Sequence, residues 1–251
     1  AIKTEPPKDA PEKNHLKERL ADLIEELDEL QRRFYARDQR ALLLIFQAMD
    51  AAGKDSTIRA VMNGVDPAGC YVHGFKQPSA DELEHDFLWR TTLRLPSKGM
   101  IGIFNRSYYE EVLVVRVHPD YLKAQRLPDI EPDEDFWEQR LHSIREHELH
   151  LARNGTVILK FFLNVSRDEQ RQRFIDRLEE ADKHWKFKEG DVEESRHWDK
   201  YMRYYESALN ATSRPWAPWY AIPADDKPYM RVRVAEIIVD TLKHMNLDYP
   251  E

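Results

Sequence analysis

Short apolar runs alternate with helix-length segments through most of this 251-residue chain, and this alternation limits the possible folds more than any other feature. Each run has the length of a strand and is bounded by Gly, Pro or polar residues. The runs are 41–47, 71–75, 100–105, 156–163 and 219–222, and helix-length stretches between them include 55–63, 133–153 and 167–180. Several runs are continuously apolar, which is typical of strands covered on both faces. The pattern predicts right-handed βαβ units, and therefore an α/β fold with a mostly parallel sheet between two layers of helices.

The ends of the predicted domain follow from composition and spacing. Residues 1–13 are rich in Pro, Lys and acidic groups, which predicts a disordered or draped N-terminal tail. Apolar residues then recur at helical spacing and predict an amphipathic helix, with Leu16, Leu20, Leu23, Leu27, Leu30 and Phe34 on its buried face. Because the chain shows no internal repeat and no long linker, we expect residues 14–251 to form a single domain.

Charge and cysteine content narrow the class of protein. The net charge is -8, which argues against a protein that coats nucleic acid, but it does not exclude a polyanion bound in a local basic cleft. The single cysteine excludes an intrachain disulfide and fits a reducing compartment. The apolar runs are far shorter than the ~20 residues of a membrane span, and no signal peptide is visible. We therefore expect a cytoplasmic protein with no membrane or nucleic-acid partner.

The residues after the first run, 47–57, have the composition of a phosphate-binding P-loop. Such a loop exposes successive backbone N–H groups and opens a helix whose N-terminus faces an anion. Two positions depart from the general pattern: Ala48 replaces its first Gly, and Asp55 replaces the Ser or Thr after Lys54. We expect Lys54 to reach the transferring phosphate as a point charge. The expected phosphate- or nucleotide-binding set is Ala51, Ala52, Gly53, Lys54, Asp55, Ser56 and Thr57.

Three further polar residues predict chemistry at the ends of the strands, where ligands bind in parallel sheets. Asp50 lies inside the loop, where a carboxylate would repel phosphate unless it held Mg²⁺ or oriented an acceptor phosphate through it. Asn105 ends the third run, where many P-loop enzymes have a metal-binding Asp, and Arg106 follows in a position to clamp phosphoryl oxygens. The alternative interpretation of this pair is a helix N-cap followed by a surface arginine.

Four segments together resemble the polyphosphate kinase 2 family, in the same order and over roughly residues 15–245. They are 50–55 (Asp-Ala-Ala-Gly-Lys-Asp), 104–110 (Phe-Asn-Arg-Ser-Tyr-Tyr-Glu), 173–186 (beginning Arg-Phe) and 223–227 (Pro-Ala-Asp-Asp-Lys). The resemblance implies a thymidylate-kinase-like, three-layer α/β/α P-loop kinase fold with a helical lid. It also implies Mg²⁺-dependent phosphoryl transfer between inorganic polyphosphate and a nucleotide, with Mn²⁺ as an alternative metal, and a homo-oligomer, either a dimer or a tetramer.

The resemblance also suggests roles for individual residues. Many family members have Asp at the position of Asn105, whereas the similar subgroup has Asn there and a Glu five residues later, here Glu110. That subgroup is associated with accepting both nucleoside mono- and diphosphates. A lid at about 167–200 would bring Arg173, Arg177, Lys183 and Lys186 to the phosphates and exclude water. On composition alone, the same segment fits a solvated helix with i,i+4 ion pairs.

The sequence leaves three functions in competition. The first is a polyphosphate kinase that makes ATP or GTP from the diphosphates, and also ADP from AMP. An ATP-dependent nucleoside monophosphate kinase of the same fold is the alternative, against which Asp50 and Asp55 count. A non-catalytic nucleotide-binding protein is the third. The His147-Glu148-Leu149-His150 stretch lacks the i,i+4 histidines of a helical zinc site, and we expect surface histidines there.

Overall fold

The structure is a computed structural model that describes residues 2–180, 184 and 189–250. Within these residues, five parallel strands form one sheet in the order β2-β3-β1-β4-β5. The strands are β1 (Ala41–Gln47), β2 (Cys70–Gly74), β3 (Ile101–Asn105), β4 (Thr156–Asn164) and β5 (Trp219–Pro223). Each lies on one of the predicted apolar runs, so the α/β fold with a parallel sheet is confirmed.

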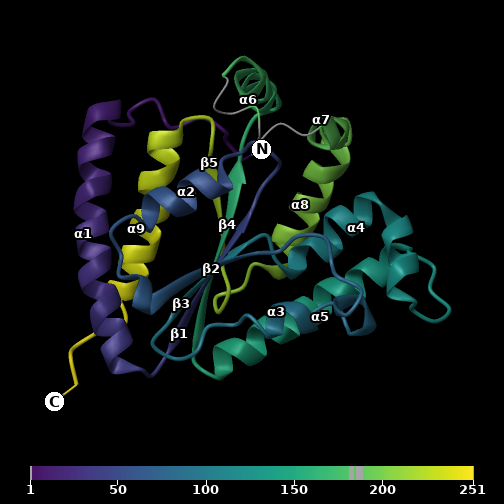
Figure 1. Ribbon diagram of the computed structural model, residues 1–251, viewed down its shortest axis with the longest axis horizontal. Helices are drawn as coiled ribbons and strands as arrows, with labels where there is room; N and C mark the ends of the chain where they lie inside the picture. The colour runs from purple at the N-terminus through teal and green to yellow at the C-terminus, as the bar shows by residue number, and fades with distance from the viewer. Residues whose placement is uncertain (1, 181–183, 185–188, 251) are drawn as a thin grey trace.

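Helices cover both faces of this sheet (Figure 1). On one side lie α1 (Lys13–Arg37), α2 (Lys54–Val61) and α9 (Lys227–Lys243). On the other side lie α3 (Trp89–Thr92), α4 (Val114–Val117), α5 (Glu134–Arg153) and α8 (Trp198–Thr212). Helix α6 (Arg167–Glu179) stands beyond the C-terminal end of β4, and α7 (Glu189–Ser195) precedes α8. Short 3₁₀ segments are η1 (Pro67–Gly69), η2 (Glu82–Glu84), η3 (Tyr108–Val112) and η4 (Pro119–Gln125).

The predicted amphipathic N-terminal helix is α1. Its buried residues include Leu16, Leu23, Leu27, Leu30 and Phe34, and it packs along α9. Helix α9 lies between α1 and the sheet, and Ala235, Ile238 and Val239 on it are fully buried. The apolar stripe of α1 therefore covers a helix and not the sheet itself.

The centre of the core is β1, all seven residues of which are buried. It pairs with β3 on one side and β4 on the other, so Leu43 lies opposite both Gly102 and Ile158. A Cβ atom at position 102 would come within 3.0 Å of the Pro96 ring, so only glycine fits there without a shift. This tight packing fixes the strand whose C-terminal end leads directly into the predicted P-loop.

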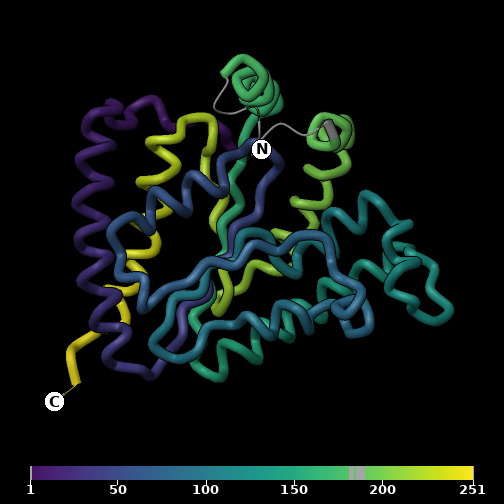
Figure 2. The backbone as a smooth tube through the Cα atoms, viewed as in Figure 1, coloured from purple at the N-terminus to yellow at the C-terminus, as the bar shows by residue number. Residues whose placement is uncertain are grey.

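The N-terminal residues lie across the C-terminal ends of β4 and β5 (Figure 2). The Asn164 side chain donates to the carbonyl oxygens of Ile2 and Lys3, each at 3.1 Å, and the Asp225 amide donates to Thr4 at 3.0 Å. These bonds agree with a draped segment, while the division into tail and domain stays a prediction. In the part of the chain described here, none of the helices has the length and apolar character needed to cross a membrane.

Candidate functional site

The P-loop joins β1 to α2 through two left-handed backbone positions. Ala51 has φ +61° and Gly53 has φ +104°, and α2 begins at the next residue, Lys54. The Ala52 amide donates to the Met49 carbonyl at 3.3 Å, which closes the turn. Positive φ at a residue other than glycine costs of order 1–3 kcal/mol and is concentrated at functional sites. With Ala48 in place of the first glycine of the pattern, the loop therefore still forms the turn that opens α2 toward the C-terminal edge of the sheet.

Lys54 is folded back onto its own loop. Its Nζ donates to the carbonyl oxygen of Ala48 at 2.8 Å and to that of Met49 at 3.4 Å. Burial lowers the pKa of the Lys54 ammonium group to about 8, while the nearby Asp50 and Glu110 carboxylates raise it. A polyanion bound against Lys54 would stabilise the charged form and raise this pKa.

Arg106 is held between two carboxylates. Its Nη2 lies 2.8 Å from Asp50 Oδ1, and its Nη1 lies 3.0 Å from Glu110 Oε2. These two carboxylates, Glu110 foremost, raise the pKa of the Arg106 guanidinium above its ordinary value. Arg106 also has φ +65°, a left-handed conformation that the neighbouring contacts must maintain. The predicted catalytic residues of the P-loop and of the segment after β3 are therefore in direct contact.

Gln47 completes this cluster and was not anticipated from the sequence. Its Nε2 donates to Glu110 Oε1 at 2.8 Å, so Glu110 is fixed from both sides, by Gln47 and by Arg106. Gln47 is fully buried at the last position of β1. The signal that could have revealed it is a polar side chain at the end of an otherwise apolar run.

Asn105 contacts Asp55 directly. The Asn105 side-chain amide donates a short hydrogen bond to the Asp55 carboxylate, which joins the end of β3 to the first turn of α2. A carboxylate at position 105 would face that of Asp55, and two carboxylates in contact disfavour the charged state of both. The pairing gives a physical reason for an amide at this position.

Two P-loop residues are placed differently from each other. Ser56 stays at the loop, where its hydroxyl donates to the Gly53 carbonyl at 3.0 Å. Thr57 is fully buried and turns its hydroxyl toward Met230 Sδ of α9, at 3.8 Å. The phosphate-binding role expected of Thr57 stays a prediction, and in this conformation the helical register of α2 directs its side chain into the core.

The base of α6 is bound to the P-loop through Arg173. Its Nη1 donates to the carbonyl oxygens of Ala51 (3.2 Å) and Ala52 (2.8 Å), and its Nη2 to those of Ala224 (2.7 Å) and Asp225 (3.2 Å). Its Nε donates to Glu169 at 2.7 Å, so all of its N–H groups have acceptors. The expected Arg173–phosphate contact stays a prediction, and in this conformation Arg173 joins the P-loop to the loop after β5.

Of the other cations expected on the predicted lid, only Arg177 lies within the described residues. One turn after Arg173, Arg177 Nη1 lies 3.2 Å from Asp191 Oδ2 of α7. Lys183 and Lys186, also expected to contact phosphate, lie outside the described residues. The described cations Lys54, Arg106, Arg173 and Arg177 all have carbonyl or carboxylate partners. In this conformation each of these four cations is therefore already hydrogen-bonded within the protein.

A single carboxylate is the candidate metal ligand. Arg106 contacts one oxygen of Asp50, and the described residues contain no group of three or more His, Cys, Asp or Glu side chains that could enclose a metal ion. Mg²⁺ commonly binds through one or two carboxylates together with substrate phosphates and water. The Asp50 carboxylate beside the P-loop is 26% exposed and fits that kind of ligation.

Comparison with known proteins gives consistent matches over nearly the whole chain. The family model described as polyphosphate kinase 2 (PPK2) matches residues 10–250. The chain is 54% identical to an ADP-polyphosphate phosphotransferase of Rhodopseudomonas palustris, over 95% of this chain and 83% of that protein. It is 47% identical to an AMP/ADP-polyphosphate phosphotransferase of Meiothermus ruber, over 93% of this chain and 84% of that protein.

A solved structure supports the same assignment. The crystal structure of polyphosphate kinase 2 from Arthrobacter aurescens TC1 superposes with a TM-score of 0.92 at 39% identity, covering 100% of this chain and 86% of that one. Fold, motif order and sequence identity therefore agree, and the chain belongs to the polyphosphate kinase 2 family.

Proposed function

We propose that this protein transfers phosphoryl groups between inorganic polyphosphate and nucleoside mono- and diphosphates, with Mg²⁺ as the divalent cation and Mn²⁺ as an alternative. The observation that carries the proposal is the contact of Arg106 with Asp50 and Glu110 beside the P-loop Lys54. The names of the relatives from R. palustris and M. ruber support ADP and AMP as acceptors.

The proposed reaction requires no covalent bond between the protein and the transferred phosphoryl group. A terminal phosphate oxygen of the nucleotide attacks the terminal phosphorus of polyphosphate, the bridging P–O bond breaks, and the chain leaves one phosphate shorter. The attacking oxygen is already anionic, so no general base is needed. Lys54 and Arg106 would stabilise the charge on the transferring group, and positioning would supply the rest of the rate enhancement.

Asp50 is the residue we assign to the metal. Bound there, Mg²⁺ would neutralise phosphate charge and relieve the repulsion between Asp50 and a polyanion. Arg106 now contacts Asp50, and phosphate oxygens would compete with both carboxylates for its guanidinium group. We further propose a cytoplasmic homo-oligomer, a dimer or a tetramer, as the working state.

Donor choice separates this proposal from its alternative. With long-chain polyphosphate and Mg²⁺ as the only donor system, we expect ADP to become ATP and AMP to become ADP, as measured by chromatography of the nucleotides. ATP with AMP and no polyphosphate is the control for a nucleoside monophosphate kinase. Turnover only in that control would contradict the proposal and favour the alternative.

Loss of either charged P-loop side chain should abolish most of the transfer. We expect Lys54→Ala and Asp50→Asn each to lower kcat/KM by roughly 100-fold or more, because each removes an interaction with the transferring phosphate or its metal. The exposed residues Lys98 and Asp240 offer matched controls, Lys98→Ala and Asp240→Asn. Activity of either P-loop variant within a few-fold of wild type, with the protein folded by circular dichroism, would refute the assigned role.

The Asn105–Asp55 contact predicts an effect on acceptor choice. Asn105→Asp places two carboxylates in contact at the end of β3, so we expect lower activity and a change of about fivefold or more in the AMP to ADP ratio of kcat/KM. Asn210→Asp adds the same charge at an exposed position on α8 and should leave the ratio unchanged. If both variants keep the wild-type ratio, the idea that position 105 sets acceptor preference is discarded.

A further inference from the structure

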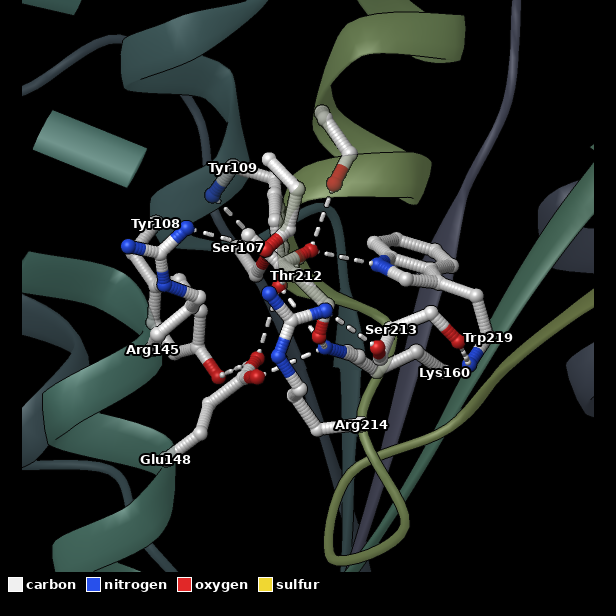
Figure 3. A network of polar contacts seen from close by, with 12 residues as sticks. Ser107, Tyr108, Tyr109, Arg145, Glu148, Lys160, Thr212, Ser213, Arg214 and Trp219 are labelled. Carbon is white, nitrogen blue, oxygen red and sulfur yellow. Dashed lines mark hydrogen bonds and ion pairs between the residues drawn. The ribbon is translucent and has the colours of Figure 1, made fainter. Parts of the chain in front are cut away.

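A fully buried ion pair lies behind the site, at the face of the sheet covered by α5 and α8 (Figure 3). Lys160 of β4 and Glu148 of α5 have no exposed side-chain surface, and Lys160 Nζ lies 2.6 Å from Glu148 Oε2. Neither residue takes part in the proposed phosphoryl transfer. A buried pair of this kind is weak evidence for stability, because well-packed apolar side chains often stabilise a core as well or better.

Lys160 uses all three of its protons. Besides Glu148, its Nζ donates to the Tyr109 hydroxyl at 2.8 Å and to the Thr212 carbonyl at 3.0 Å. Three donors and three acceptors match the charged lysine, although burial lowers its pKa to about 8. The pair therefore joins β4, α5, the segment after β3 and the end of α8 at one point.

Glu148 holds the same segment through its second oxygen. Its Oε1 accepts from the Tyr108 hydroxyl at 3.0 Å and from the Tyr109 hydroxyl at 2.9 Å. Both tyrosines are almost completely buried and belong to η3. Burial raises the pKa of both hydroxyls well above the ordinary value, so they remain protonated donors.

The segment fixed in this way carries the site. Glu110 directly follows Tyr109, and Arg106 precedes the tyrosine pair by two residues in a left-handed conformation. Ser107 between them caps η3 by accepting from the Tyr109 amide at 3.2 Å. With only four peptide units between Arg106 and Glu110, a displacement of Tyr109 moves both.

We propose that Lys160, Glu148 and the Tyr109 hydroxyl are positioning residues that hold Arg106 and Glu110 in the geometry needed for phosphoryl transfer. The proposal rests on the functional roles proposed above for Arg106 and Glu110. Misplacement of a reacting or binding group by about 1 Å can cost roughly 100-fold in rate. A buried tether with every donor satisfied provides the rigidity that such precision needs.

Two kinds of variant separate positioning from stability. Tyr109→Phe keeps the aromatic ring and the ion pair but removes the hydroxyl that receives Lys160. The double variant Glu148→Gln/Lys160→Met removes both charges at similar volume, which should avoid the cost of the single Lys160→Met variant, where a buried carboxylate is left without its partner. Glu146→Gln and Tyr121→Phe, at exposed positions, are the matched controls.

The readouts are amide hydrogen exchange in residues 106–112, the unfolding midpoint, kcat, and KM for polyphosphate and ADP. In Tyr109→Phe and in the double variant, we expect amide hydrogen exchange in residues 106–112 to be about threefold or more faster than in wild type. The exchange rates in α1 should stay at their wild-type values. We also expect kcat about tenfold to 100-fold lower, KM within about twofold, and a midpoint for the double variant near wild type.

Three results would overturn the proposal. One is exchange in 106–112 that stays at the wild-type rate, and another is faster exchange with unchanged kcat. The third is a kcat that is low in Lys160→Met but returns to the wild-type value in the double variant, together with the unfolding midpoint. That result would show that the ion pair has a merely structural role. Hydrogen exchange requires no substrate. A wild-type protein that fails to use polyphosphate would therefore refute the proposed function, while the exchange rates would still show whether Lys160, Glu148 and Tyr109 hold the segment 106–112 in place.

Discussion

The position of Arg106 between Asp50 and Glu110 is the interaction on which the site depends. It joins the P-loop to the segment after β3, two stretches that are 56 residues apart along the chain. The contact requires β1 and β3 to be neighbours, which their parallel pairing and the close approach of Gly102 to Pro96 provide. Arg106 is left-handed in this contact, and its guanidinium group is bound by Glu110, which Gln47 fixes in turn. Sheet order, packing and charge therefore converge on one guanidinium group.

Charge balance explains how an acidic protein is suited to a polyanion. The net charge is -8, and the described site cations are already bound to carbonyl or carboxylate oxygens. Under the proposed function, polyphosphate oxygens would replace these partners at Lys54 and Arg106, and a divalent cation would neutralise the charge of Asp50. Such an exchange needs neither a permanently open basic groove nor a positive net charge.

Much of the fold and part of the site could be predicted from the sequence. The apolar runs identified the strands β1 to β5 of the described residues, and the 47–57 and 104–110 segments placed Asp50, Lys54, Arg106 and Glu110 at one edge of the sheet. The side-chain contacts of Thr57 and Arg173 in this conformation could not be predicted, because a motif gives residue types and not side-chain directions. The turn of α2 sends Thr57 into the core, and the carbonyl oxygens of two loops meet at Arg173.

The Lys160–Glu148 pair was missed because its two signals are individually ordinary. Lys160 is one charged residue in the apolar run of β4, and Glu148 lies in a helical stretch predicted to expose its histidines. His150 is indeed exposed, whereas His147 is partly buried and Glu148 completely so. The two residues are 12 positions apart on consecutive elements, and only the way α5 packs against β4, which their spacing does not reveal, brings the two charges together.

The role of Arg106 in binding a polyanion is tested most directly by calorimetric titration of inorganic tripolyphosphate, with Mg²⁺, into wild type and Arg106→Gln at low and high salt. We expect binding to wild type that weakens as salt rises, because screening reduces the attraction to partly exposed cations. We expect an affinity about tenfold or more lower in Arg106→Gln, where Asp50 and Glu110 lose the cation that balances them. Equal affinities of the two proteins, or an affinity of the wild type that does not change with salt, would contradict this role of Arg106.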